Sequence, residues 1–160
     1  MIILGIDPGF GRMGYGVIEA TGPETRYITA GCIETLKNTP VHERIEKIYD
    51  ELAIIIKTEH PHTLAIEKLF FSKNTKTALQ VAETRGVILL LAQKNNLRIR
   101  EFAPMEVKIA TTGYGLAQKS QIQYMVASIL KMPVAPASDD AADALAVALT
   151  AAARRITELA

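Results

Sequence analysis

Two stretches of this chain end a run of apolar residues with a single carboxylate, and this pattern constrains the fold most strongly. Residues 2–7 are Ile-Ile-Leu-Gly-Ile-Asp, and residues 63–67 are Thr-Leu-Ala-Ile-Glu. A short run this apolar is typical of a strand that is buried on both faces of a sheet. The sequence therefore predicts two buried strands, with Asp7 and Glu67 at the ends where they leave the sheet.

A third group of acids begins the alanine-rich segment 139–156, which we expect to be a helix. Asp140 and Asp143 are three residues apart, so they share one helix face. Asp139 is four residues from Asp143, so helix geometry alone does not choose between Asp139 and Asp140. Asp139 could instead cap the helix, and acids in a first turn are also favoured by the helix dipole.

Acids from these distant segments can meet at one edge of the sheet. A carboxylate at the end of a buried strand needs a cation or several donors, because burying a lone charge is costly. Carboxylate oxygens are the ligands that Mg²⁺ prefers, and such clusters bring metal ions to phosphodiesters. We therefore expect Asp7, Glu67 and the acids of residues 139–143 to form a metal site for phosphoryl transfer.

The remaining pattern predicts an α/β protein with a mixed five-stranded sheet flanked by helices. Three strands joined by tight turns form an antiparallel meander, and later strands, separated by helices, are parallel to it. We expect one nuclease domain over residues 1–157. The expected strands are 2–7, 13–20, 26–35, 63–67 and 97–102, and the expected helices are 41–59, 74–95 (capped by Asn74), 104–111, 119–131 and 139–156.

The helix expected at 74–95 contains an apolar run, Val87–Ala92, that is longer than one sheet face can cover. Apolar surface in excess of the core is typical of a subunit interface. We therefore expect this helix to contribute to a dimer, with Leu91 as an example of an outward-facing residue.

The formal net charge is only +1, but the charge is unevenly distributed. Residues 68–119 carry nine Lys and Arg against three Asp and Glu, whereas residues 1–67 carry six against ten. A basic surface beside an acidic pocket suits a polyanionic substrate such as DNA. The single cysteine, Cys32, excludes an internal disulfide, and we expect it to be a buried thiol. With no signal peptide and no membrane-length apolar run, we expect a cytoplasmic protein.

The segment Gly-Ile-Asp7-Pro-Gly9 is by itself ambiguous. A similar motif opens the sugar-kinase and actin-like ATPases, but those folds need a second phosphate loop and a second domain, for which 160 residues leave no room. Further motifs follow in order: Gly14-x-Gly16, Ala65-Ile-Glu67, Lys108, Gln118-Lys-Ser-Gln121 and Asp140-Ala-Ala-Asp-Ala-Leu145. Together, over residues 1 to about 150, these motifs resemble the bacterial Holliday-junction resolvase family RuvC.

This resemblance implies an RNase H-like fold and a homodimer that resolves four-way DNA junctions by paired, symmetric nicking during recombination and repair. It also implies a partnership with the RuvA and RuvB branch-migration complex. By position, the catalytic and metal-binding carboxylates are Asp7, Glu67, Asp140 and Asp143, so the resemblance favours Asp140 over Asp139. Two Mg²⁺ ions per site are expected, with Mn²⁺ as a substitute.

The same resemblance assigns DNA contacts to Lys108, Lys119 and the aromatic Phe70. Phe71 is adjacent, and by default one of two neighbouring phenylalanines belongs to the core. An exposed phenylalanine could stack on an unpaired base near the crossover. The resemblance gives Lys68 no role.

Two other functions are compatible with the same residues. One is an RNase H-type nuclease that acts on an RNA–DNA hybrid or a flap, which, unlike a resolvase, can work as a monomer. The other is a junction-binding subunit without activity, but the presence of all four carboxylates argues against it. Neither the preferred cleavage sequence nor the contacts to RuvA and RuvB follow from the residues.

Overall fold

The computed structural model describes residues 1–69, 75–133, 136 and 138–159. Its elements match the predicted ones to within a few residues at each end. In chain order they are β1 (Ile2–Asp7), β2 (Arg12–Thr21), β3 (Glu24–Glu34), α1 (Val41–Glu59), β4 (Thr63–Glu67), α2 (Thr75–Lys94), β5 (Arg98–Phe102), α3 (Pro104–Thr112), α4 (Lys119–Ile129) and α5 (Asp139–Leu159).

The strands form one five-stranded sheet in the order β3-β2-β1-β4-β5. β1 pairs with β2, and β2 with β3, in antiparallel fashion, whereas β1 pairs with β4, and β4 with β5, in parallel fashion. The predicted combination of a meander and parallel strands is therefore confirmed. β1 lies at the centre, and the carboxyl ends of β1 and β4 are neighbours.

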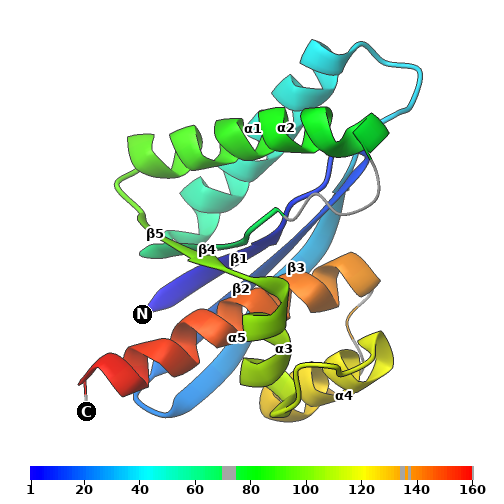
Figure 1. Cartoon of the computed structure of the whole chain (residues 1–160). Coiled ribbons are helices and arrows are strands. Elements are labelled where there is room, and N and C mark those ends of the chain that lie inside the picture. The colour runs from blue at the N-terminus through cyan, green and yellow to red at the C-terminus, as the bar shows by residue number, and fades with distance from the viewer. Residues whose placement is uncertain (70–74, 134–135, 137, 160) are drawn as a thin grey trace.

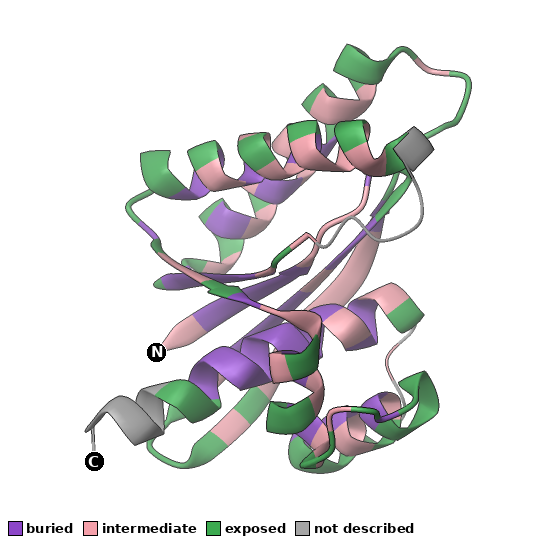
Figure 2. Cartoon of the chain, in the orientation of Figure 1, coloured by how far each residue is buried: buried purple, intermediate pink, exposed green. Residues whose placement is uncertain are grey.

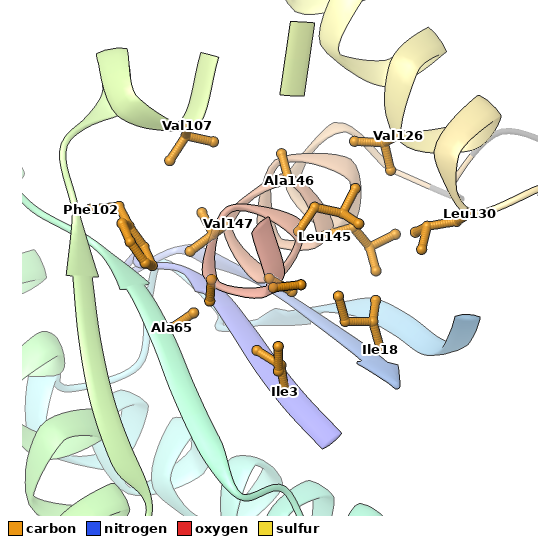
Figure 3. Close-up of a cluster of buried hydrophobic side chains, with 14 of the residues drawn as sticks. Ile3, Ile18, Ala65, Phe102, Val107, Val126, Leu130, Leu145, Ala146 and Val147 are labelled. Atoms are coloured by element: carbon orange, nitrogen blue, oxygen red, sulfur yellow. The ribbon is translucent and has the colours of Figure 1, made fainter. Parts of the chain in front are cut away.

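Helices cover both faces of the sheet (Figure 1). α1 and α2 lie on one face, and α5 lies on the other with α3 and α4 packed beyond it. Buried residues concentrate in the central strands and in α5 (Figure 2). Alternation along β1 sends Leu4 and Ile6 into the core beneath α1 and α2, and Ile3 into the core beneath α5, where it lies near Ile18 and Leu145 (Figure 3).

α5 lies unusually close to the sheet because glycines face it. A Cβ atom at Gly5 would collide with the backbone of Ala144, and one at Gly16 would lie 2.7 Å from the Leu145 side chain. A Cβ atom at Gly14 would collide with the carbonyl group of Asp140. These absent side chains fix the height of the first turns of α5 above β1 and β2.

One predicted detail of α2 is wrong. Leu91 is only 2% exposed and packs in the core between α2 and its own sheet, whereas its neighbour Leu90 is 54% exposed. The apolar run therefore covers the sheet with one face and leaves Leu90 and Leu79 on the other. The predicted cap Asn74 lies outside the described residues. Within the described part of the chain, no helix is both long and apolar enough to cross a membrane.

Candidate active site

The alternation of side chains along each strand brings the two strand-end acids to the same face of the sheet. In β1, Asp7 follows Ile3 and Gly5 onto the face covered by α5, and in β4, Glu67 follows Ala65 onto that face. The parallel register pairs Ile6 with Ile66, so Asp7 and Glu67 leave the sheet side by side. The predicted meeting of these two acids is thus present.

Asp143 joins these acids from α5. The three carboxylates line one cavity of about 270 Å³ together with Lys108 and Lys119. The remaining lining is apolar, from Pro104, Val107, Ile122 and Ala146. The cavity therefore combines three acids and two lysines from five different elements in a partly apolar setting.

The electrostatics of this cavity are dominated by uncompensated negative charge. Burial raises the pKa of Asp7 to about 7, and the charges of Asp143, Glu67 and Asp140 act in the same direction. Burial, with the charge of Asp143 added, also raises the pKa of Glu67 to about 7, while Lys108 opposes this shift. Burial raises the pKa of Asp143 as well, against the opposing hydrogen bond from Lys119.

The two lysines are positioned by the starts of two short helices. α3 begins at Pro104, and the side chain of Glu106 accepts a hydrogen bond of 2.6 Å from the Ala103 N–H, so the first turn that precedes Lys108 is fixed. α4 begins at Lys119 itself, because Gln121 accepts a hydrogen bond of 2.8 Å from the Gln118 N–H.

Lys119 forms ion pairs with Asp143 at 3.1 Å and with Asp139 at 3.5 Å. Burial acts to lower the pKa of Lys119, but the hydrogen bond and the attraction to Asp143 outweigh it, so the pKa is raised. Lys119 therefore remains a cation at the edge of the cavity.

The structure distinguishes the neighbouring acids at the start of α5. Ser138 caps the helix, since its hydroxyl oxygen accepts the Ala141 N–H at 3.1 Å, so the suggested capping role of Asp139 is wrong. Asp139 points toward α4, where it accepts a hydrogen bond of 2.6 Å from Gln123. Asp140 lies above Gly14, close enough for its charge to raise the pKa of Asp7, but it does not line the cavity.

The sequence reasoning missed what surrounds Asp140. Its Oδ2 atom accepts a hydrogen bond of 2.8 Å from the Nε of Arg12 and a weaker contact of 3.7 Å from the thiol of Cys32. Arg12 in turn binds Glu34 at 2.6 Å. The signal was available, because Arg12 lies two residues before Gly14 and so shares its face of β2. Cys32 is only partly buried, so the prediction of a buried thiol is wrong.

The residues present fit a hard divalent cation. The donors are carboxylate oxygens, and the raised pKa values of Asp7 and Glu67 show negative charge that nothing nearby neutralises. As the side chains stand, no three acidic, histidine or cysteine side chains within the described residues are grouped closely enough to hold an ion. Arg12 and Lys119 instead pair with Asp140 and Asp143. The predicted DNA contact Phe70, like Phe71, lies outside the described residues.

The sheet order, the helix that crosses it on glycines and the acids at the ends of β1 and β4 define an RNase H-like fold with an acidic site. The family model described as crossover junction endodeoxyribonuclease RuvC matches residues 3–151. The chain therefore belongs to the RuvC family of crossover junction endodeoxyribonucleases.

Individual relatives agree with this assignment. The crossover junction endodeoxyribonuclease RuvC of Pelotomaculum thermopropionicum is 47% identical over 149 residues, which cover 93% of this chain and 91% of the relative. That of Thermotoga petrophila is 45% identical over 161 residues, covering 98% of both chains. The structure of Thermus thermophilus RuvC in complex with a Holliday junction substrate is 31% identical with a TM-score of 0.92, and the match covers 99% of this chain and 96% of that one.

Proposed function

We propose that this chain is a structure-specific endodeoxyribonuclease that resolves four-way DNA junctions by paired, symmetric nicking. The observation that carries the proposal is the cavity in which Asp7, Glu67 and Asp143 face Lys108 and Lys119. Acids alone would repel a phosphodiester, and lysines alone would only bind it. Their combination in a RuvC-family chain supports phosphodiester cleavage, and the Thermus thermophilus relative is seen with a Holliday junction substrate.

Asp7, Glu67, Asp140 and Asp143 are the residues that would hold Mg²⁺, two ions per site, with Mn²⁺ as a substitute. When bound, such ions activate water and stabilise the leaving 3′ oxygen. The remaining steps belong to the chain itself. The buried position of Asp7 keeps its oxygens at the end of a rigid strand, and the apolar wall from Val107 and Ile122 limits the water around the reacting phosphate.

Lys108 and Lys119 supply the positive charge that a phosphate group needs in this acidic setting. Both lie on the first two turns of helices that open toward the cavity. Lys119 is held by Asp143 at 3.1 Å in the metal-free protein. Once the charge of Asp143 is neutralised, Lys119 is free to donate to a phosphate oxygen, so we assign it to placement of the scissile phosphate.

We further propose a homodimer formed through the outer face of α2. Leu79 and Leu90 are 65% and 54% exposed there, and a Cβ atom at Gly86 would meet nothing, so a second helix can approach closely. An isologous dimer suits a four-way junction because both have two-fold symmetry. Partnership with RuvA and RuvB and a cytoplasmic location follow from the family resemblance, and the free thiol of Cys32 suits a reducing compartment.

Product mapping on three synthetic substrates tests this function. The purified protein with Mg²⁺ should cut a mobile four-way junction at two symmetric points. It should leave an RNA–DNA hybrid and a flap uncut under the same conditions. Cutting of the hybrid or the flap in preference to the junction would instead identify another type of RNase H-like nuclease.

A further inference from the structure

Asp140 is the one proposed metal ligand that does not line the cavity, and a chain of three side chains holds it outside. Arg12 donates from Nε to Asp140 Oδ2 at 2.8 Å and from a terminal nitrogen to Glu34 at 2.6 Å. Cys32 also contacts Asp140 Oδ2, at 3.7 Å. Both contacts to Asp140 therefore come from the side of β3.

The strand register shows which way Asp140 has turned. Gly14 pairs with Asp7 on one side and with Cys32 on the other, and the backbone of Asp140 lies directly above Gly14. The Asp140 side chain thus starts midway between the cavity at Asp7 and the Cys32 side. Its contacts place its carboxylate on the Cys32 side, away from Asp7, with which it shares a repulsive charge interaction.

Arg12 is built to hold this position. Two edges of its planar guanidinium group are occupied, one by each carboxylate, and it is Glu34, its cross-strand partner, that takes the second edge. The Arg12 side chain is 52% exposed and that of Asp140 is 24% exposed. An ion pair this exposed contributes little to folding, about 0–1 kcal/mol, so its main effect is on where the carboxylate points.

We propose that Arg12, anchored by Glu34, is a positioning residue that holds Asp140 away from the metal site and must release it before Asp140 can bind an ion. The inference rests on the proposed role of Asp140 as a metal ligand. Arg12 therefore competes with the metal for the same carboxylate, and loading of the site includes the loss of the Arg12–Asp140 pair.

Titration of the full-length protein with Mn²⁺ in the absence of DNA, followed by electron paramagnetic resonance, tests this competition. Arg12→Met should bind Mn²⁺ more tightly, by about three- to tenfold, because a half-exposed ion pair no longer has to be broken. Arg26→Met is the matched control, since Arg26 forms a similar pair with Glu19 on the same sheet at 2.8 Å. The control should bind Mn²⁺ like the wild type.

A double-mutant cycle separates release of Asp140 from a general effect of charge. With Asp140→Asn as background, Arg12→Met should no longer change Mn²⁺ affinity. If the Asp140→Asn protein binds no Mn²⁺, Arg12→Lys decides. It keeps the charge but loses the two-point contact, so its affinity should lie between those of the wild type and Arg12→Met.

Three results would overturn the proposal: unchanged or weaker binding in Arg12→Met, equal tightening in the Asp140→Asn background, or, where Arg12→Lys decides, wild-type affinity of that variant. Failure of the wild-type protein to bind any Mn²⁺ would instead refute the proposed metal site itself. Thermal melting accompanies each titration, because a variant with an unchanged melting temperature has kept its fold.

Discussion

The acids of the cavity are costly residues for the fold to contain. Asp7 and Glu67 are each held at the end of a strand where burial and neighbouring charge raise the pKa to about 7. In the unfolded chain the same groups titrate near 4. Between these values the folded protein binds protons that the unfolded chain has lost. The free energy of unfolding therefore falls as the pH rises from about 4 to about 7.

Replacement of Asp7 by Asn should remove part of this penalty. At pH 8 and without metal, Asp7→Asn should be more stable than the wild type by about 2 kcal/mol, since each unit of pKa shift corresponds to about 1.4 kcal/mol and the other acids relax. At pH 4 the difference should vanish. Denaturant unfolding at several pH values in EDTA measures this. Asp50→Asn, an exposed change on α1, is the control and should show no such trend.

A gain in stability for Asp7→Asn at pH 4 equal to that at pH 8 would contradict this reasoning. So would a loss at pH 8, because Asp7 would then be stabilised in its charged form by groups that the structure does not show. A divalent cation should reverse the order at pH 8 by stabilising the wild type, the protein that keeps the charge.

Among single residues, Asp7, Glu67 and Asp143 could be located from the sequence because an acid directly after a buried strand, or on the inner face of a helix, is too costly to place there without a cation nearby. The contact of Asp140 with Arg12 could not be predicted in this way. That contact depends on the pairing of β2 with β3 and on the height of α5 above them, which are tertiary features. Rotamers of half-buried side chains do not follow from spacing along the chain.

Among the elements, α5 has the greatest influence on the site, because its first turns carry Asp140 and Asp143 over the central strands. Its small residues and the glycines beneath it are complementary. The alanine-rich pattern predicted the helix, and the glycine positions of the family motif are explained by its close approach. The sequence could not specify which glycines lie under which turn, since that requires the register of β1 with β2.

Gly14→Ala tests this packing. The added Cβ atom would collide with the carbonyl group of Asp140, so the first turn of α5 must shift. We expect a loss of about 1–3 kcal/mol in the free energy of unfolding, as for other overpacked sites, together with loss of cleavage. In Gly11→Ala, the control in the same β1–β2 connection, the Cβ would lie 3.6 Å from the Arg44 side chain, an ordinary contact. Wild-type stability and cleavage in Gly14→Ala would show that α5 is not held at this height.

For the whole molecule, the predicted α/β order and the mixed sheet are correct because periodicity along the chain changes clearly between strands and helices. The choice of Leu91 as an outward residue was wrong because an all-apolar run does not show which of its faces meets the sheet. The exposed face with Leu79 and Leu90 is visible only once α2 is placed on the sheet.

Leu90→Glu should therefore weaken the proposed dimer. On a two-fold axis the new charge would be buried in an apolar contact twice, which is costly without a partner. Sedimentation at micromolar concentration should show a wild-type dimer and a folded Leu90→Glu monomer, with circular dichroism as the check on folding. Leu116→Glu, at a 71% exposed position on the opposite side of the sheet, should remain dimeric. A wild-type monomer that still cuts junctions in pairs would contradict the dimer.

The central claim is that the acids converging at one edge of the sheet cleave junction DNA. Cleavage of a synthetic four-way junction by Asp143→Asn and Asp139→Asn, each with a binding assay on the same DNA, tests it most directly. Asp143→Asn keeps the size of the side chain but removes the charge that a hard cation needs, so cleavage should fall by about two orders of magnitude or more while binding persists. Asp139→Asn, outside the cavity, should cleave normally. An inactive Asp139→Asn beside a fully active Asp143→Asn would contradict the account.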